Sequence, residues 1–104
     1  MTPEAEPARW TLTLYVSGSS PLSAVAIAAV RELCEEEFEG RAEVEIVDVH
    51  DRPALLVADR VIVTPTLVRK LPRPFRRIVG DMSHIGRVRI GLDLKPTLRD
   101  LSDR

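Results

Sequence analysis

The segment GDMSHIGRVRIGLDL, residues 80–94, decides which of two folds this chain adopts. As a strand, the segment would place four aliphatic side chains on one face: Val88, Ile90, Leu92 and Leu94. Arginine, glycine and aspartate occupy the positions between them, so the pattern follows the period of two that is typical of a half-buried strand.

The same segment also fits a helix. Ser83 would be its N-cap, and Ile85, Val88 and Leu92 would form an apolar stripe at helical spacing. The helix would leave Ile90 and Leu94 on its opposite face. Each of its two glycines would cost about 1 kcal/mol of helix stability relative to alanine. A segment with two periodicities indicates a chain with two accessible folds, which bears directly on function.

Size and composition predict a single globular domain. The chain has 104 residues, of which 44% are hydrophobic, and we expect a domain at residues 9–95 between tails at 1–8 and 96–104. No apolar run approaches the ~20 residues that a membrane span needs, and the N-terminus lacks the apolar core of a secretion signal. The single cysteine, Cys34, excludes an internal disulfide and indicates a reducing compartment, so we expect a cytoplasmic protein. We expect the Cys34 thiol to act as a small buried hydrophobe.

Charge is divided between the two halves of the chain. Residues 1–51 carry eleven acidic and three basic residues, a net charge of −8, whereas residues 52–104 carry twelve basic and five acidic residues, a net charge of +7. This division indicates head-to-tail contact between copies or a protein partner with a complementary surface; solubility alone is the alternative. Nucleic-acid binding is disfavoured, because the basic run 69–77 contains one aromatic residue, Phe75, and the whole chain is slightly acidic.

Hydrophobic periodicity and turn residues predict the order of elements. The expected elements are a half-buried strand 10–16, a helix from Ser19 or Ser20 to Phe38, a strand 42–49, a short helix that begins at residues 51–53, a strand 61–68, a hairpin strand 76–80 and the ambiguous segment 80–94. The long helix should bury Leu22, Val25, Ala29, Leu33 and Phe38. The order β-α-β-α-β-β-α is that of a single-domain thioredoxin-like fold, with a parallel pair formed by the first two strands.

Two local features bear on chemistry within that fold. Thr64–Pro65 stands where the thioredoxin-like fold places a cis-proline, and a buried strand tolerates proline only for such a special reason. Ser20 and Ser23 stand where redox members carry a C-x-x-C pair. Serine hydroxyls form no disulfide, so disulfide exchange is excluded at this site. A serine hydrolase would need a general base, and only His50 and His84 are available, so we expect no catalytic site and no enzyme.

Metal and cofactor sites are not expected either. His50 lies between Asp48 and Asp51, but only two of these side chains share one side of a strand end, which is too few ligands for a metal. A solvated strand end and helix cap explains the cluster. No glycine-rich phosphate loop is present, and no cofactor is implied.

Five motifs occur in an order that resembles the KaiB family of circadian-clock proteins. They are LYVSG at 14–18, VDV at 47–49, TPTL at 64–67, LPRPFRRIVGDMS at 71–83 and IGLDL at 90–94, within a match that covers about residues 10–95. The resemblance implies a metamorphic protein. One form is a self-associating ground state, a dimer or tetramer, with a C-terminal strand; the other is a thioredoxin-like monomer in which that segment is a helix. Gly91 and Asp93 are then the candidate fold-switch residues.

The resemblance also implies partners. The monomeric form would bind the N-terminal ATPase ring of a hexameric KaiC-like protein and modulate its phosphorylation and ATPase cycle, and in some clocks it would also sequester a KaiA-like protein. The candidate partner-binding residues are Glu43, Glu45, Arg69, Arg73, Arg76 and Arg77.

This chain departs from the clock members in two places. It lacks their strongly acidic tail, and Ala42 and Glu45 replace an aromatic residue and a lysine on the second strand, which contributes to partner binding in the family. A reversed charge at that edge disfavours the usual partner surface. The chain therefore resembles a divergent paralogue that serves a KaiC-like ATPase without KaiA, or a different partner.

Between the two folds, the sequence favours the thioredoxin-like one. Val61–Val63 prefer strand to helix, Pro65 would break a helix, and Ala42 weakens the oligomeric ground state. The ground-state fold remains the alternative. A redox or glutathione-handling protein on the thioredoxin scaffold and a polyanion-binding module are the alternative functions.

Overall fold

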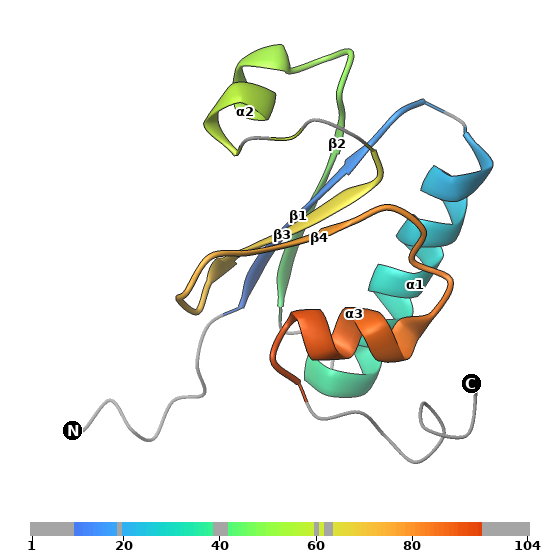
Figure 1. The fold of residues 1–104 in the computed structure, drawn as a ribbon, viewed down its shortest axis with the longest axis vertical. Helices are drawn as coiled ribbons and strands as arrows, with labels where there is room; N and C mark the ends of the chain where they lie inside the picture. The colour runs from blue at the N-terminus through green and yellow to red at the C-terminus, as the bar shows by residue number, and fades with distance from the viewer. Residues whose placement is uncertain (1–9, 19, 39–41, 60, 62–63, 95–104) are drawn as a thin grey trace.

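The computed structural model describes residues 10–18, 20–38, 42–59, 61 and 64–94, so the expected tails at 1–8 and 96–104 lie outside the described residues. Its elements follow the predicted order (Figure 1): β1 Thr11–Val16, α1 Pro21–Phe38, β2 Glu43–Asp48, α2 Pro53–Ala58, β3 Thr66–Leu71, β4 Arg76–Val79 and α3 Ile85–Gly91.

The four strands form one mixed sheet with the order β2-β1-β3-β4. β1 pairs in parallel with β2, antiparallel with β3, and β3 pairs antiparallel with β4. Neighbouring β1 and β2 run in parallel because the long helix α1 crosses over between them, as the βαβ pattern requires. The predicted thioredoxin-like fold is thus confirmed.

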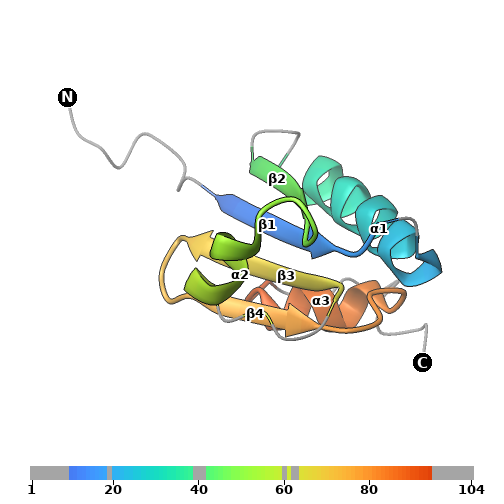
Figure 2. The same cartoon turned by 90° about the horizontal axis from the view of Figure 1, so that it is seen from above.

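Two apolar clusters lie on opposite faces of the sheet. The larger one joins the even-numbered side chains of β1 to α1 and α3 and comprises Leu12, Leu14, Val16, Ala26, Val30, Leu33, Cys34, Leu67, Met82, Val88 and Leu92. The smaller one joins Tyr15, Val47 and Val68 to Leu56 of α2, which covers the other face (Figure 2). Since both faces of β1 are covered, its residues from Leu12 to Val16 are buried, and the prediction of a half-buried strand is wrong.

The buried face of α1 differs from the predicted stripe. Its buried residues are Ser23, Ala26, Val30, Leu33 and Cys34. Of the predicted set, Leu22 and Val25 are exposed, and only Leu33 is fully buried. The prediction was wrong because a hydrophobic pattern does not place a serine inside, whereas here the Ser23 hydroxyl accepts a hydrogen bond from the Ser17 N–H at 3.1 Å. Cys34 is buried, and burial raises the pKa of its thiol, which favours the unreactive form.

The third strand begins later than predicted. β3 starts at Thr66, opposite Tyr15, and extends to Leu71, opposite Thr11, whereas the sequence predicted a strand at 61–68. Pro65 has no N–H to give to a ladder, so pairing begins after it. Val61 donates its N–H to the Leu56 carbonyl at 2.9 Å instead, and residues 62 and 63 of the expected strand lie outside the described residues.

The segment 80–94 adopts the helical alternative, with one correction at its start. His84, not Ser83, is the N-cap residue of α3, and its side chain makes no capping hydrogen bond. Ser83 belongs to the preceding turn, where its N–H donates to Asp81 at 2.9 Å. Val88 and Leu92 are buried and Ile90 is 61% exposed, as the helical stripe predicts.

α3 lies close to β4 at Gly91. A Cβ atom at this position would stand 2.7 Å from Cγ1 and 3.0 Å from Cδ1 of Ile78. Such a separation requires the Ile78 side chain to move, so the backbone of α3 approaches the sheet closely at Gly91.

We therefore expect Gly91→Ala to depend on residue 78. Alanine favours a helix by about 1 kcal/mol over glycine, but overpacking against Ile78 costs about 1–3 kcal/mol. The change should be less favourable, by at least about 1 kcal/mol, in the wild-type chain than in an Ile78→Ala background. A double-mutant cycle of unfolding free energies measures this coupling; additive effects of the two substitutions would contradict the close approach.

Candidate functional site

The position of the redox motif is occupied by a helix cap. Ser20 precedes α1, and its Oγ accepts the Ser23 N–H at 3.2 Å and donates to Ser23 Oγ at 2.8 Å. Ser23 is buried and its Oγ in turn accepts the Ser17 N–H. These hydroxyls therefore satisfy backbone donors at the start of a helix, which is an ordinary structural role for serine.

The Thr64–Pro65 peptide bond is cis.

The cluster around His50 is a turn rather than a ligand set. Asp48 accepts the His50 N–H at 2.9 Å through Oδ1 and the Gly18 N–H at 3.1 Å through Oδ2. His50 and Asp51 are exposed. Among the residues that the structure describes, no three His, Cys, Asp or Glu side chains are grouped so that they could hold a metal ion.

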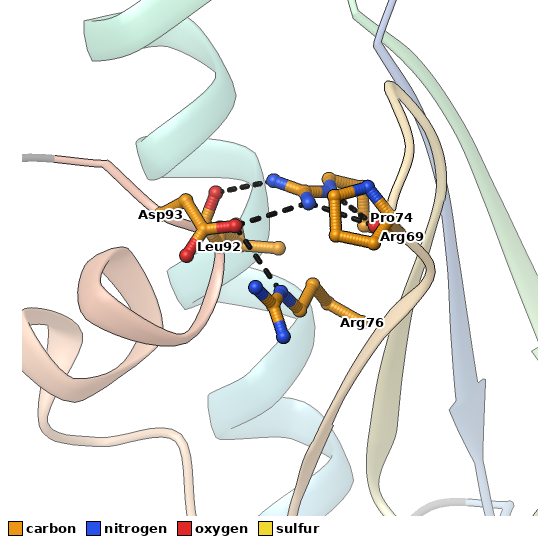
Figure 3. A network of polar contacts seen from close by, with 5 residues as sticks. All are labelled: Arg69, Pro74, Arg76, Leu92 and Asp93. Carbon is orange, nitrogen blue, oxygen red and sulfur yellow. Dashed lines mark hydrogen bonds and ion pairs between the residues drawn. The ribbon is translucent and has the colours of Figure 1, made fainter.

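The most connected polar group lies where α3 ends, and it centres on Arg69 (Figure 3). Arg69 is 3% exposed, and its Nη1 donates to the Leu92 carbonyl at 2.6 Å. Its Nε and Nη2 donate to the Pro74 carbonyl, at 3.3 and 2.8 Å, and Nη2 also reaches Asp93 Oδ2 at 3.1 Å. The guanidinium lies 5.3 Å from the centre of the Trp10 ring. A buried cation requires such complete pairing, since an unpaired one would be strongly destabilising.

Asp93 closes the C-terminus of α3. Its φ is +65°, the left-handed conformation that aspartate adopts more readily than most residues. The Asp93 N–H donates to the Ile90 carbonyl at 3.0 Å, and the Leu94 N–H donates to the Arg89 carbonyl at 2.8 Å, which together form a Schellman motif. Leu94 then packs against the larger core cluster, so it does not lie on the outer face of a helix as the helical alternative implied.

Two arginines act on the Asp93 carboxylate. Arg76 Nε donates to Asp93 Oδ2 at 3.1 Å, and Arg69 reaches the same oxygen. The hydrogen bond from Arg76, followed by that from Arg69, lowers the pKa of Asp93 below its ordinary value. Asp93 therefore ties the end of α3 to β3 and to β4.

A second arginine anchors α3 to α1. Arg89 is 2% exposed, and its guanidinium forms ion pairs with Glu36, at 2.6 Å, and with Glu37. Both glutamates lie in the last turns of α1. Sequence reasoning missed this anchor, because Arg89 alternates with aliphatic residues in a way that is typical of a solvated face.

A third polar group lies on the opposite face of the sheet. Tyr15 is fully buried, and its hydroxyl donates to Asp59 Oδ2 at 2.5 Å. Lys70 Nζ lies 3.2 Å from the same oxygen. Burial, and then the hydrogen bond to Asp59, raises the pKa of Tyr15 above its ordinary value. Sequence reasoning missed this group as well; its one signal was a tyrosine on the strand that the βαβ pattern places inside the sheet.

The expected partner-binding residues fall in different places. Glu43 and Glu45 are exposed on β2, and Glu45 pairs with Arg52 at 2.8 Å. Arg73 and Arg77 are exposed on the β3–β4 hairpin. Arg69 is buried, so it cannot contact a partner in this fold.

Arg76 is accessible to a partner and is also paired within the fold. It is half exposed, yet it holds Asp93. The two fold-switch candidates, Gly91 and Asp93, lie close together at the end of α3. Gly91 approaches Ile78 of β4, and Asp93 pairs with Arg69 and Arg76.

In the described residues, no helix is both long enough and apolar enough to cross a bilayer.

We expect the contribution of Asp93 to depend on pH. Since its pKa is lowered in the folded state, its stabilising effect is fully present above about pH 4, the ordinary value for aspartate, and is lost as the pH falls through the lowered pKa. Asp93→Asn keeps a residue that tolerates positive φ but removes the charge. The stability difference between wild type and variant, measured by urea unfolding, should shrink in acid. A difference that stays constant with pH would contradict the role of the charge.

We also expect the serine cap to stabilise α1. Ser20→Ala removes the acceptor of the Ser23 N–H and should cost about 1 kcal/mol of unfolding free energy. Ser20→Asn, which keeps an acceptor at the N-cap, is the matched control and should cost less. Equal stabilities of the two variants in urea unfolding would show that the cap contributes nothing.

Known proteins are similar to this chain in sequence and in fold. A model of the KaiB domain matches residues 13–94. A circadian clock protein KaiB3 from Synechocystis sp. is 42% identical over 88 residues, 85% of this chain and 86% of the relative. A circadian clock oscillator protein KaiB from Prochlorococcus marinus is 46% identical over 85 residues, 82% of this chain and 71% of the relative.

Solved structures share the fold of this chain. The N-terminal domain of Synechococcus elongatus SasA is similar with a TM-score of 0.68 at 25% identity, covering 89% of this chain and 91% of that domain. Chloroplastic thioredoxin z shares the fold alone, with a TM-score of 0.59 at 20% identity over 88% of this chain and 93% of that one. Because the domain model matches this chain from within β1 to the end of the Schellman motif, the chain belongs to the KaiB family of circadian clock proteins.

Proposed function

We propose that this chain is a regulatory protein that binds the ATPase ring of a KaiC-type clock protein and modulates its phosphorylation and ATPase cycle. The match of the KaiB domain to residues 13–94 carries this proposal, because it includes all but the first two residues of the sheet, all three helices and the segment that ends α3. The proposal is made for a KaiC-type partner alone, since Ala42 and Glu45 depart from the residues that the resemblance links to the usual partner surface.

Binding, rather than catalysis, is the function that the site favours. The hydroxyls of Ser20 and Ser23 are engaged with each other and with backbone N–H groups of the α1 start. A redox or glutathione-handling enzyme on this scaffold would need a thiolate at that place, and the one cysteine, Cys34, is buried in the core with a raised pKa. No observation favours the redox alternative.

We further propose that the chain is metamorphic and that the Arg69–Asp93 contacts bias it toward the thioredoxin-like fold. α3 has seven residues, which is too short for a stable isolated helix, so its stability comes from tertiary contacts. Those contacts include the Arg69 bonds to the end of α3 and the Arg89 pairs to α1. A shift of a few kcal/mol in such contacts suffices to exchange two folds of similar free energy.

Exposed charges supply the proposed partner surface. Glu43 and Glu45 on β2 and Arg73 and Arg77 on the β3–β4 hairpin are accessible in this fold. Arg69 supports binding indirectly in this proposal, because it holds α3 rather than facing a partner.

The test is co-elution with a KaiC-type hexamer in each nucleotide state. Wild type should bind, whereas Arg69→Met should bind at least about tenfold more weakly, because a loss of about 1.4 kcal/mol in the binding-competent fold has that effect. Arg87→Met is the matched control: Arg87 is exposed on the same helix, and its replacement should leave binding unchanged. NMR chemical shifts of residues 85–91 would show whether the fraction of helix falls together with affinity.

Two results would overturn the proposal. Absence of co-elution in every nucleotide state would exclude the KaiC-type partner. Equal affinity of the Arg69→Met variant, with the helix of residues 85–91 lost, would exclude the thioredoxin-like fold as the binding form.

A further inference from the structure

The helix α2 is held to the sheet at its ends rather than along its length. It has six residues and lies over the face of the sheet opposite α1 and α3 (Figure 2). Pro53, Ala54 and Ala58 are exposed, and Val57 is 80% exposed. Leu56 is the α2 residue that packs against the smaller apolar cluster. A helix of this length has little stability of its own, so the contacts at its ends decide whether it stays on the sheet.

The C-terminal end of α2 is fixed by a buried carboxylate. Asp59 follows the last residue of the helix and is buried. Its Oδ2 accepts the Tyr15 hydroxyl at 2.5 Å and lies 3.2 Å from Lys70 Nζ. Tyr15 and Lys70 belong to β1 and β3, the two inner strands of the sheet. One oxygen atom therefore joins the end of α2 to both inner strands, and a buried carboxylate requires partners of this kind.

The N-terminal end of α2 is held more weakly. Arg52 pairs with Glu45 of β2 at 2.8 Å, and the two side chains are 53% and 50% exposed. Ion pairs this exposed contribute little to stability. The turn before Arg52 is fixed without α2, because the N–H groups of His50 and Asp51 donate to Asp48.

From this asymmetry we propose that residues 52–59 form a strap that opens and closes over the sheet as one unit, with Asp59 as its catch. In the closed form, which the structure shows, Asp59 holds the strap to Tyr15 and Lys70. In the open form, the strap pivots at the turn of residues 48–51 while the four strands stay paired, and Tyr15, Val47 and Val68 are uncovered. The proposal does not rest on the proposed function, since it needs neither a KaiC-type partner nor a second fold.

Opening of the strap breaks few contacts. It breaks those of Asp59, the packing of Leu56 and the hydrogen bond from the Val61 N–H to the Leu56 carbonyl at 2.9 Å. The larger core cluster stays intact, since none of its described members lies in residues 52–59. The paired residues of the strands also lie outside the strap. Segments with few buried contacts open at a lower free energy than the core of a domain, so the strap opens without global unfolding.

Amide hydrogen exchange of the intact chain, followed by NMR, measures this opening. The reporter is the Val61 N–H, whose hydrogen bond to Leu56 is broken when the strap opens. The references are the amides of Leu12 and Leu14 in β1, which is paired on both sides, and the Leu92 N–H, which donates to the Val88 carbonyl at 3.0 Å. After correction for intrinsic rates, the Val61 amide should exchange at least about tenfold faster than the references.

Matched charge removals at the two ends of the strap test the catch. Asp59→Asn removes the charge that Lys70 pairs with and should speed exchange of the Val61 amide by about a further tenfold, because hydrogen bonds to charged groups are strong. Glu45→Gln removes the same charge at the exposed end and should speed it by about threefold at most. The β1 and Leu92 amides should keep their wild-type rates in both variants.

Tyr15→Phe is the second variant, and it serves if Asp59→Asn does not fold. It keeps the buried ring and removes only the hydroxyl that donates to Asp59, so it should also speed exchange of the Val61 amide while the reference rates stay unchanged.

The inference fails on any of three outcomes. If the wild-type Val61 amide exchanges no faster than the β1 amides, α2 leaves the sheet only when the whole domain unfolds. If Asp59→Asn and Glu45→Gln have equal effects, Asp59 is not the catch. If the Leu92 or β1 amides speed up together with Val61 in Asp59→Asn or Tyr15→Phe, the contact supports the whole fold rather than a strap.

Discussion

The buried guanidinium of Arg69 is the group on which the C-terminal half of this structure depends. A cation that is 3% exposed is tolerated only when its donors are paired, and here the acceptors come from two places: the Pro74 carbonyl in the hairpin turn, and Leu92 and Asp93 at the end of α3. Neither is on β3 itself. The strand that carries Arg69 thus requires both the hairpin and the helix to be in place, because a buried cation that loses its acceptors is strongly destabilising.

The same reasoning explains why a short helix with poor local signals is stable at this position. α3 contains two glycines, begins without a side-chain cap and spans seven residues. Its backbone propensity is therefore weak. What holds it is burial of Val88 and Leu92, the Arg89 pairs to Glu36 and Glu37, and the Schellman motif closed by Asp93. Each of these contacts reaches outside the helix or lies at its very end, so tertiary structure determines the conformation of this segment.

Sequence reasoning worked where a single hydrophobic period was decisive and failed where a polar side chain was buried. The strands β1 and β2 and the helix α1 were predicted with almost their observed bounds. The buried face of α1 was misplaced because Ser23 is inside, where its hydroxyl accepts the Ser17 N–H. Arg69 was a candidate partner-binding residue, and its burial differs from the usual exposure of arginine. Nothing in the run 69–77 distinguishes the arginine that is buried from those that are not; the difference lies in carbonyl groups that only the folded chain brings near.

The double periodicity of residues 80–94 can now be explained in the same physical terms. Arg87 and Arg89 share one face in a strand, but in α3 Arg87 is exposed, whereas Arg89 is buried and paired with Glu36 of α1. The helix therefore depends on Glu36 and Glu37, about fifty positions earlier in the chain, and on Arg69 and Arg76 in the hairpin. The segment carries both patterns, and residues outside it choose between them. Control of a fold switch in this protein would accordingly be found as much in α1 and the β3–β4 hairpin as in Gly91 and Asp93.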